Sequence, residues 1–344
     1  MPRVPLQLRL TNVVPVAAVA LILTACSDTA TAPTSHLTPQ AASDSRSPEL
    51  NNEHGHMFRT RDWFANDDAK TGGSRHSSGS GIYFHGGPVL LTHTNVAAVY
   101  WASAPIFVGA PAVGTHGAAS ADASLIAFFL NNIGGSPYFN INHSYTNGTT
   151  AITNAVSYTQ YWANGTSAPS GTQSVSDAQM IAMLQSGFTS GALTYDASTL
   201  YAIFTAGKVN LGGGFGTQYC AYHTHGTVTI NGIAQTVLYA AMPYNYAYPS
   251  ACTSGFQPAN GSADPGADYE VNTLVHETEE TTTDMMGTAW YDNRGYENAD
   301  KCAWTWGSTY SSAGGTANVN LGGKNFLIQQ NWVNSGSGGC ALKY

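Results

Sequence analysis

The chain has 344 residues, of which 43% are hydrophobic, 11% aromatic and only 9% charged, and its formal net charge is −8. That length allows a leader and one domain with a sizeable core, and seven Trp, nineteen Tyr and twelve Phe exclude disorder of the whole chain. No Lys or Arg occurs between His76 and Gly207, which excludes a surface that follows a phosphate backbone, so nucleic acid is not an expected partner.

The first 26 residues predict an export signal. Two arginines precede an apolar run at 13–23 that is too short to span a bilayer and is followed by Thr-Ala-Cys. This ending resembles a bacterial lipobox, in which Cys26 would be lipidated and become the mature N-terminus. The alternative is an ordinary signal peptide cleaved near Ala25. Both place the protein in the cell envelope or outside the cell, with a lipid anchor as its only expected contact with the membrane.

Residues 27–80 are rich in Ser, Thr, Ala, Pro, Asn and Gly, which predicts a flexible tether. Apolar spots at 57–58 and 63–64 interrupt it. Three of its histidines are expected to be solvated linker side chains, a metal role being the rarer case: His54, His56 and His76. The folded domain is then expected at 81–344.

Strand and helix patterns alternate along that domain. The expected elements are, in chain order, a strand at 89–101, a helix at 120–132, an extended segment at 152–162, a helix from Ser176, a strand at 199–205, hairpin arms at 227–230 and 233–242, a helix at 268–284 and a strand at 326–333. Ser176 and Gln179 have the spacing of a capping box, and Asn231-Gly232 is the strongest hairpin signal. This order predicts one α/β or α+β domain with a mixed β-sheet flanked by helices.

Four cysteines remain when Cys26 is set aside. An even number in an exported protein predicts two disulfides, for which three pairings exist. We favour Cys220–Cys252 and Cys302–Cys340, because each pair brackets one contiguous block of sequence.

Acidic residues are concentrated in one short segment of a domain that otherwise avoids charge. Ten of the twenty lie within 264–300: Asp264, Asp268, Glu270, Glu277, Glu279, Glu280, Asp284, Asp292, Glu297 and Asp300. Carboxylates that serve solubility would be scattered over the surface. Their concentration indicates a site for a cation.

Inside this segment, His276, Glu277 and Glu280 form an H-E-x-x-E motif. On a helix His276 and Glu280 project side by side and could grip one metal ion, while Glu277 could take a proton from water as general base. This is the pattern of H-E-x-x-H zinc hydrolases with the second His exchanged for Glu, a zincin-like helix. Zn²⁺ is the expected ion, with Mn²⁺ or Ca²⁺ as alternatives. The competing interpretation is an exposed acidic helix that carries His276 without a role.

A mononuclear zinc site needs a third protein ligand. The candidates are Glu297 and Asp300, which follow a turn-rich connection, and His225, which shares one strand face with His223 by alternation. Asp284 lies two turns beyond His276 and is expected to be too far along the helix.

Other chemistries have weaker support. The sequence has no G-x-S-x-G elbow and no P-loop. A glycosidase pair could be drawn from Glu277, Glu280 and Glu297, but aromatic content of this size is more typical of a core.

The domain resembles the EXORDIUM / phosphate-induced protein family over most of 82–344. The resemblance rests on the Y-F-H-G-G-P-V-L run at 83–90, the strand at 200–205 and the C-A-Y-H-T-H-G run at 220–226. The stretches at 276–284, 290–292 and 297–302 resemble the H-E-x-x-E-x-x-T-D, W-Y-D and E-x-x-D-x-C motifs of bacterial relatives. The resemblance implies a secreted or cell-surface protein, associated in plants with growth and wall-related signalling and without an established catalytic activity.

Two hypotheses follow. The first is an exported, lipid-anchored, metal-dependent hydrolase that acts on a peptide or a cell-envelope polymer, peptide bonds being favoured. His276 and Glu280 would be ligands, and Asp300, Glu297 or His225 would complete the site. The second is a non-catalytic surface module that binds glycan or protein and holds a structural cation or none. A catalytic site must open into a cleft, whereas a structural site is closed.

Overall fold

The computed structural model describes residues 56–71, 81–260 and 263–344. Its centre is a seven-stranded mixed sheet. The strands are, in order across the sheet, β1 (His56–Arg59), β9 (Tyr219–Ile230), β10 (Ile233–Met242), β7 (Thr199–Phe204), β3 (Thr94–Trp101), β5 (Val156–Asn164) and β4 (His116–Ala118). Strands β10, β7, β3 and β5 are mutually parallel, and β9, β1 and β4 each run antiparallel to the neighbour through which they join the sheet. The predicted mixed sheet is confirmed.

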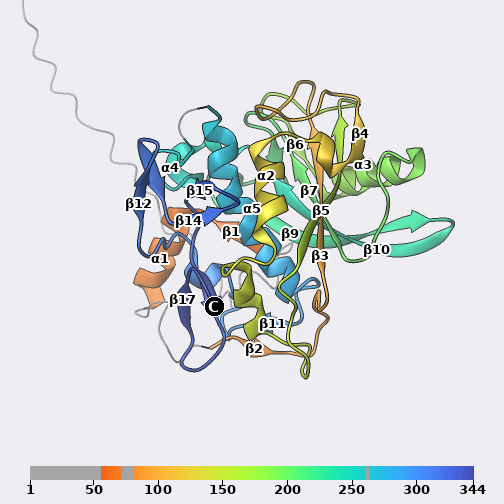
Figure 1. The fold of residues 1–344 in the computed structure, drawn as a ribbon. Coiled ribbons are helices and arrows are strands. Elements are labelled where there is room, and N and C mark those ends of the chain that lie inside the picture. The colour runs from red at the N-terminus through yellow and green to blue at the C-terminus, as the bar shows by residue number, and fades with distance from the viewer. Residues whose placement is uncertain (1–55, 72–80, 261–262) are drawn as a thin grey trace, which may run out of the picture. The chain divides into compact units, whose positions relative to one another are not determined.

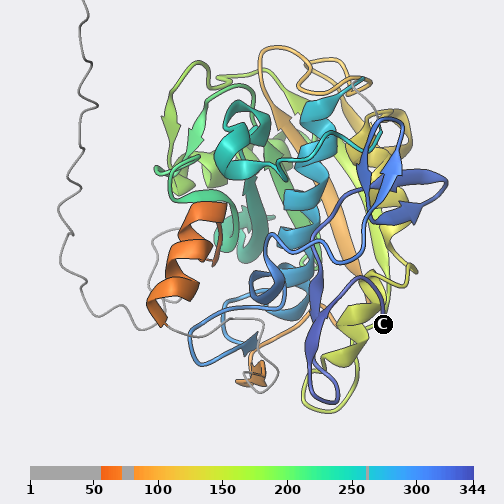
Figure 2. The same ribbon diagram turned by 90° about the vertical axis from the view of Figure 1, so that its left-hand side faces the viewer.

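Helices cover both faces of the sheet (Figure 1). Helices α2 (Leu125–Ile133) and α5 (Pro265–Thr283) lie on one face, and α3 (Asp177–Ser190) lies on the other. In Figure 2, α5 runs through the middle of the domain, in front of the strands. The predicted arrangement of a sheet flanked by helices is therefore confirmed as well.

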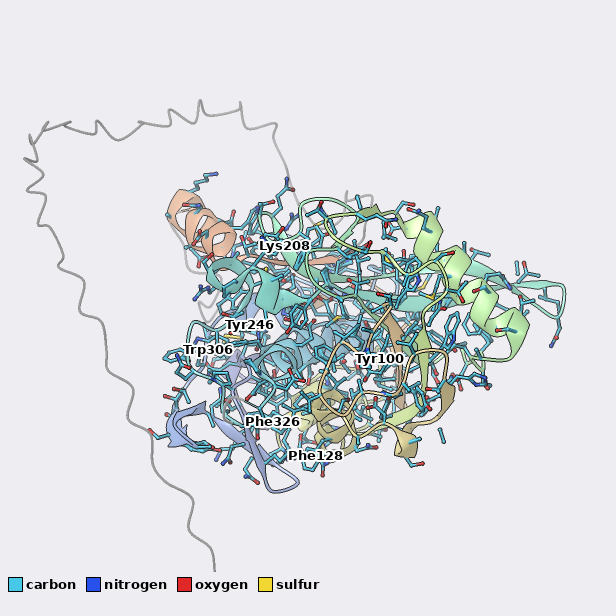
Figure 3. All side chains as sticks on the ribbon, turned by 90° about the horizontal axis from the view of Figure 1, so that it is seen from above. Tyr100, Phe128, Lys208, Tyr246, Trp306 and Phe326 are labelled. Atoms are coloured by element: carbon cyan, nitrogen blue, oxygen red, sulfur yellow. A yellow bond between two sulfur atoms is a disulfide. The ribbon has the colours of Figure 1, made fainter. Side chains whose placement is uncertain are left out.

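Shorter elements surround these layers. They are α1 (Arg61–Thr71), α4 (Pro249–Cys252), the 3-10 helices η1 (Ala119–Ala121), η2 (Phe139–Ser144), η3 (Asn245–Ala247) and η4 (Asp300–Cys302), and the strands β2 (Tyr83–Phe84), β6 (Ser174–Val175), β8 (Asn210–Leu211), β11 (Trp290–Tyr291), β12 (Tyr310–Ser312), β13 (Gly315–Ala317), β14 (Val319–Leu321), β15 (Lys324–Phe326), β16 (Asn331–Val333) and β17 (Gly339–Ala341). The last six pair as three small ribbons. Phe326 of β15 packs against Phe128 of α2, with ring centroids 6.4 Å apart (Figure 3), so the C-terminal segment covers the outer side of the helical layer.

Local sequence signals predicted the positions of most helices and strands correctly. The Ser176 capping box with Gln179 is present, and Asn231 and Gly232 have φ of 51° and 79°, as the tight hairpin turn requires. Strand β9 begins at Tyr219, before the predicted arm, and the predicted strand at 326–333 is divided between β15 and β16. These differences lie where pairing with distant strands sets the boundary.

The predicted tether at 27–80 needs correction at 56–71. There the chain forms β1, which extends the sheet beyond β9, and then α1. Phe58 and Phe64 are completely or almost completely buried, so the apolar spots of this segment anchor it to the core. The leader at 1–26, Cys26 and the rest of the tether lie outside the described residues.

The two favoured disulfides are confirmed. Cys220–Cys252 joins β9 to α4 and Cys302–Cys340 joins η4 to β17, with Cα atoms 5.3 and 5.5 Å apart. The second bridge holds the segment after α5 against the C-terminal ribbon. Within 56–71, 81–260 and 263–344, no helix has both the length and the apolar character needed to cross a membrane.

Candidate metal centre

Helix α5 positions most of the candidate ligands, and its ends are defined by two aspartates. The Asp264 side chain accepts a hydrogen bond from Ala267 N at 3.0 Å, and Pro265 occupies the first turn. At the other end, the carboxylate of Asp284 accepts the backbone N–H groups of 288–290. Asp284 therefore stabilises the turn after the helix.

Almost all of α5 is buried, although the helix is rich in Thr and Glu. The hydroxyls of Thr278 and Thr282 donate to backbone carbonyls one turn earlier, at 2.7 and 2.6 Å. Glu279 Oε2 accepts the side-chain amides of Asn142 and Asn331 at 2.5 and 2.7 Å. Most polar groups on these sides of the helix thus have protein partners, although Glu279 Oε1 and Thr281 Oγ1 have none.

The two predicted ligands of the motif, His276 and Glu280, lie close to Asp300, one of the candidates for the third ligand. His276 Nε2 lies 3.1 Å from Glu280 Oε1 and 3.5 Å from Asp300 Oδ1. Donor atoms of these three residues lie within 4.8 Å of one another, and all three side chains are 0% exposed. Asp300 N also donates to Glu280 Oε1 at 2.9 Å, so η4 is fixed directly against α5. We call these residues the first triad.

The ring of His276 is oriented by Gln329. The amide nitrogen of Gln329 donates to Ala299 O at 2.8 Å, so its Oε1 accepts from His276 Nδ1 at 3.3 Å. Nε2 of the ring is therefore the nitrogen that faces Glu280 and Asp300. Metal-binding histidines are commonly oriented by such an outer hydrogen bond.

A second group of donors shares one residue with the first triad. His223 Nδ1 lies 3.2 Å from Glu277 Oε2 and 3.6 Å from Glu280 Oε2. Alternation along β9 explains the position of His223, because the neighbouring Tyr222 points to the opposite face and donates to Asp177 of α3. We call His223, Glu277 and Glu280 the second triad, and its donors also lie within 4.8 Å of one another.

Glu297 closes the cluster from the side of β1. Its Oε2 lies 2.6 Å from His56 Nδ1 and 3.6 Å from His223 Nε2. The His56 and His223 rings stack with centroids 5.3 Å apart. At Gly287 a Cβ atom would come within 2.5 Å of His56 Nε2, so glycine allows this close approach. The sequence analysis assigned His56 to the tether and missed its place here.

The structure thus brings together Glu277, His276, Glu280, Glu297 and Asp300 of the predicted site. His225 is exposed and belongs to neither triad, although it shares a strand face with His223. Both histidines pair with β10, but His223 also pairs with His56 of β1, whereas His225 lies further along the hairpin, beyond the end of β1. His223 was recognised only as the partner of His225.

Burial and mutual repulsion dominate the electrostatics. Burial, reinforced by the nearby carboxylates, raises the pKa of Glu277 and Glu297 well above the usual range, and burial together with Asp300 raises the pKa of Glu280 to about 7. Burial and the neighbouring imidazoles lower the pKa of His223 well below its usual value. For His276 burial acts in the same direction, but Glu280 and Asp300 outweigh it and raise its pKa. The carboxylates lack the compensation that burial of charge requires.

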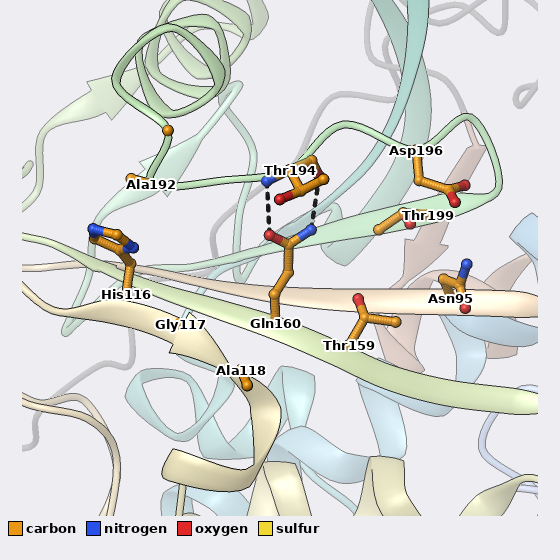
Figure 4. Close-up of a pocket in the computed structure, with 11 residues that line it drawn as sticks. Asn95, His116, Gly117, Ala118, Thr159, Gln160, Ala192, Thr194, Asp196 and Thr199 are labelled. Carbon is orange, nitrogen blue, oxygen red and sulfur yellow. Dashed lines mark hydrogen bonds between the residues drawn. The ribbon is translucent and has the colours of Figure 1, made fainter.

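Two of the open cavities that lie away from this centre are lined largely by polar side chains. One of about 420 Å³ is lined by Asn95, His116 and Thr199 among others, with Gln160 and Thr194 hydrogen-bonded across it (Figure 4). The other, of about 630 Å³, is lined by Trp101, Trp162 and several amide and hydroxyl side chains. Neither is lined by a residue of the two triads.

No family model, curated protein or solved structure matches this chain. The resemblance to the EXORDIUM / phosphate-induced protein family and the zincin-like character of α5 therefore stay predictions.

Proposed function

We propose that this protein is an exported cell-envelope protein whose core is organised around a bound divalent cation. The observation that carries this proposal is the first triad, in which an imidazole nitrogen and two carboxylate groups converge in the interior. Both Asp300 oxygens and His276 Nε2 lack a hydrogen-bond partner there. A buried donor set of this kind is stable when a cation compensates it.

The donor set defines the class of ion. One imidazole with carboxylate oxygens suits Zn²⁺ and is acceptable to Mn²⁺, whereas Ca²⁺ prefers oxygen donors alone. The complete burial of His276, Glu280 and Asp300 is typical of a closed structural site. This burial favours the hypothesis of a non-catalytic surface module with a structural cation over that of a hydrolase. The two disulfides are consistent with export, and the lipid anchor at Cys26 is part of the same proposal.

Metal content tests this proposal. Elemental mass spectrometry on the full chain, after dialysis in metal-free buffer, should find a divalent metal in the wild type and a loss of at least one equivalent in Asp300→Asn. Glu279→Gln is a matched control, because Glu279 is equally buried on the same helix but is bound by amides, and it should retain the metal. A metal-free wild type whose melting temperature does not respond to Zn²⁺, Mn²⁺ or Ca²⁺ would overturn the proposal.

Peptide hydrolysis is the second candidate, and the position of Glu277 favours it. This carboxylate follows the metal-binding imidazole in the motif, faces the cluster, and has one oxygen, Oε1, without a hydrogen-bond partner. It could accept a proton from water as general base. Turnover of an unfolded protein substrate that is abolished by a chelator and by Glu277→Gln would support it. A Gln variant as active as the parent, or a wild type without turnover, would refute it.

A further inference from the structure

We propose that the centre holds two divalent cations, bridged by the carboxylate of Glu280. This inference rests on the proposed function, because the first triad must bind its ion for a bridge to exist. It adds a second site, built from His223 and Glu277, that the H-E-x-x-E motif alone does not imply.

The two oxygens of Glu280 face different partners. Oε1 lies 3.1 Å from His276 Nε2, and Oε2 lies 3.6 Å from His223 Nδ1. Each oxygen therefore belongs to a separate triad, so the carboxylate spans two adjacent donor sets. A carboxylate that bound a single ion through the first triad would leave Oε2 buried among the second set without a partner.

Unpartnered buried atoms mark the second triad independently. Glu280 Oε2 and Glu277 Oε1 have no hydrogen-bond partner, and both side chains are 0% exposed. Leaving such atoms unsatisfied is costly, and ionised oxygens are the most costly of all. Glu280 Oε2 lies 3.6 Å from His223 Nδ1, beside the Glu277 carboxylate, which indicates a ligand among these three side chains.

Charge balance also indicates two divalent cations. Glu277, Glu280, Glu297 and Asp300 provide four carboxylates that are all 0% exposed. Lys301, the adjacent basic residue in sequence, is bound to Asp292 at 3.1 Å. When all four carboxylates are ionised as ligands, one divalent cation balances half of their negative charge, and two balance all of it if the imidazoles bind as neutral ligands.

Glu297 and His56 extend the second site. Glu297 Oε2 lies 3.6 Å from His223 Nε2, and His56 Nδ1 holds the same oxygen at 2.6 Å. Glu297 can therefore serve the second ion as a further ligand or as an outer partner that orients His223. This arrangement explains why β1, a strand of four residues, carries a buried histidine.

The stoichiometry of Zn²⁺ binding tests the inference. The full chain is stripped with a chelator under native conditions, and Zn²⁺ alone is titrated in competition with a chromophoric chelator. We expect two equivalents in the wild type and in the Glu279→Gln control, one in His223→Gln, one in Asp300→Asn, and tight binding of neither ion in Glu280→Gln.

The outcomes separate the two proposals. One equivalent in the wild type would overturn the bridged pair and leave the proposed function intact, and none would overturn both. Two equivalents in His223→Gln would place the second ion elsewhere and would also overturn the pair. If a variant fails to fold, electron paramagnetic resonance of the wild type loaded with Mn²⁺ decides the matter. A spin-coupled signal supports two bridged ions, whereas the six-line signal of isolated Mn²⁺ contradicts them.

Discussion

Replacing Gln329 with Met tests whether the imidazole of His276 is held in place for a metal ion. Gln329 accepts from His276 Nδ1 at 3.3 Å and donates to Ala299 O at 2.8 Å, and its side chain is 0% exposed. Met has nearly the same length and no hydrogen-bonding amide. The substitution therefore removes the orienting partner while the interior stays filled.

The size of the effect follows from these two contacts. Loss of an outer hydrogen bond to a metal-binding histidine weakens metal affinity by about 10- to 100-fold, or about 1.4 to 2.7 kcal/mol. The variant also leaves His276 Nδ1 without a partner, whereas Ala299 O keeps the hydrogen bond from Cys302 N at 3.1 Å. Because an unsatisfied buried group costs about 1–3 kcal/mol, we expect the cation-free protein to lose a free energy of unfolding of that size.

Competition with a chromophoric chelator measures the affinity, and urea denaturation in excess chelator measures the stability of the cation-free protein. Gln330→Met is the matched control, since Gln330 Nε2 donates to Cys340 O at 3.0 Å and does not contact the cluster. It should lose stability without losing affinity. If Gln329→Met binds Zn²⁺ as tightly as the parent, the assignment of His276 Nε2 as a metal ligand is refuted.

Three further predictions concern the scaffold. Burial raises the pKa of Glu270 from its usual value of 4.5 to about 8, so its contribution to stability is present below pH 4.5 and lost as the pH rises towards 8. Glu270→Gln should therefore be more stable than the parent at pH 9 by on the order of 5 kcal/mol and similar to it at pH 4.5, and equal urea midpoints at both pH values would contradict this. Loss of the Cys302–Cys340 bridge, which spans 38 residues, should destabilise the fold by about 4 kcal/mol, and an unchanged melting temperature of the double Ala variant would exclude that role. Ser176→Ala removes the acceptor for Gln179 N at 3.3 Å and should lower the free energy of unfolding by about 1 kcal/mol, measurable as a shift of the urea midpoint.

Features set by neighbouring residues could be predicted from the sequence. The capping box at Ser176, the turn at Asn231-Gly232 and the spacing of His276 and Glu280 on a helix are local, and the structure has all three. The disulfide pairing was accessible because each bridge encloses one block of sequence.

Features that depend on strand pairing could not be predicted in the same way. His56 lies in a strand of four residues inside a segment of tether-like composition, and only its pairing with β9 places it beside Glu297. The distinction between His223 and His225 has the same origin, because alternation puts both on one face but only the fold decides which lies beneath α5. The choice among Glu297, Asp300 and His225 likewise required the path of the chain after the helix.

Two adjacent glutamates show why the burial of α5 argues for cations. Glu279 and Glu280 are both 0% exposed on the same helix. Oε2 of Glu279 accepts two side-chain amides, whereas its Oε1 has no hydrogen-bond partner. Glu280 receives one backbone N–H at Oε1, and its Oε2 faces Glu277 and His223 without a hydrogen-bond partner. Only 9% of the residues in this chain are charged. Side-chain amides bind the carboxylate of Glu279, whereas the other four carboxylates of the centre lie together beside imidazoles. Amides can compensate a single buried carboxylate, whereas a group of buried carboxylates requires positive charge. Divalent ions supply the most positive charge in the smallest volume.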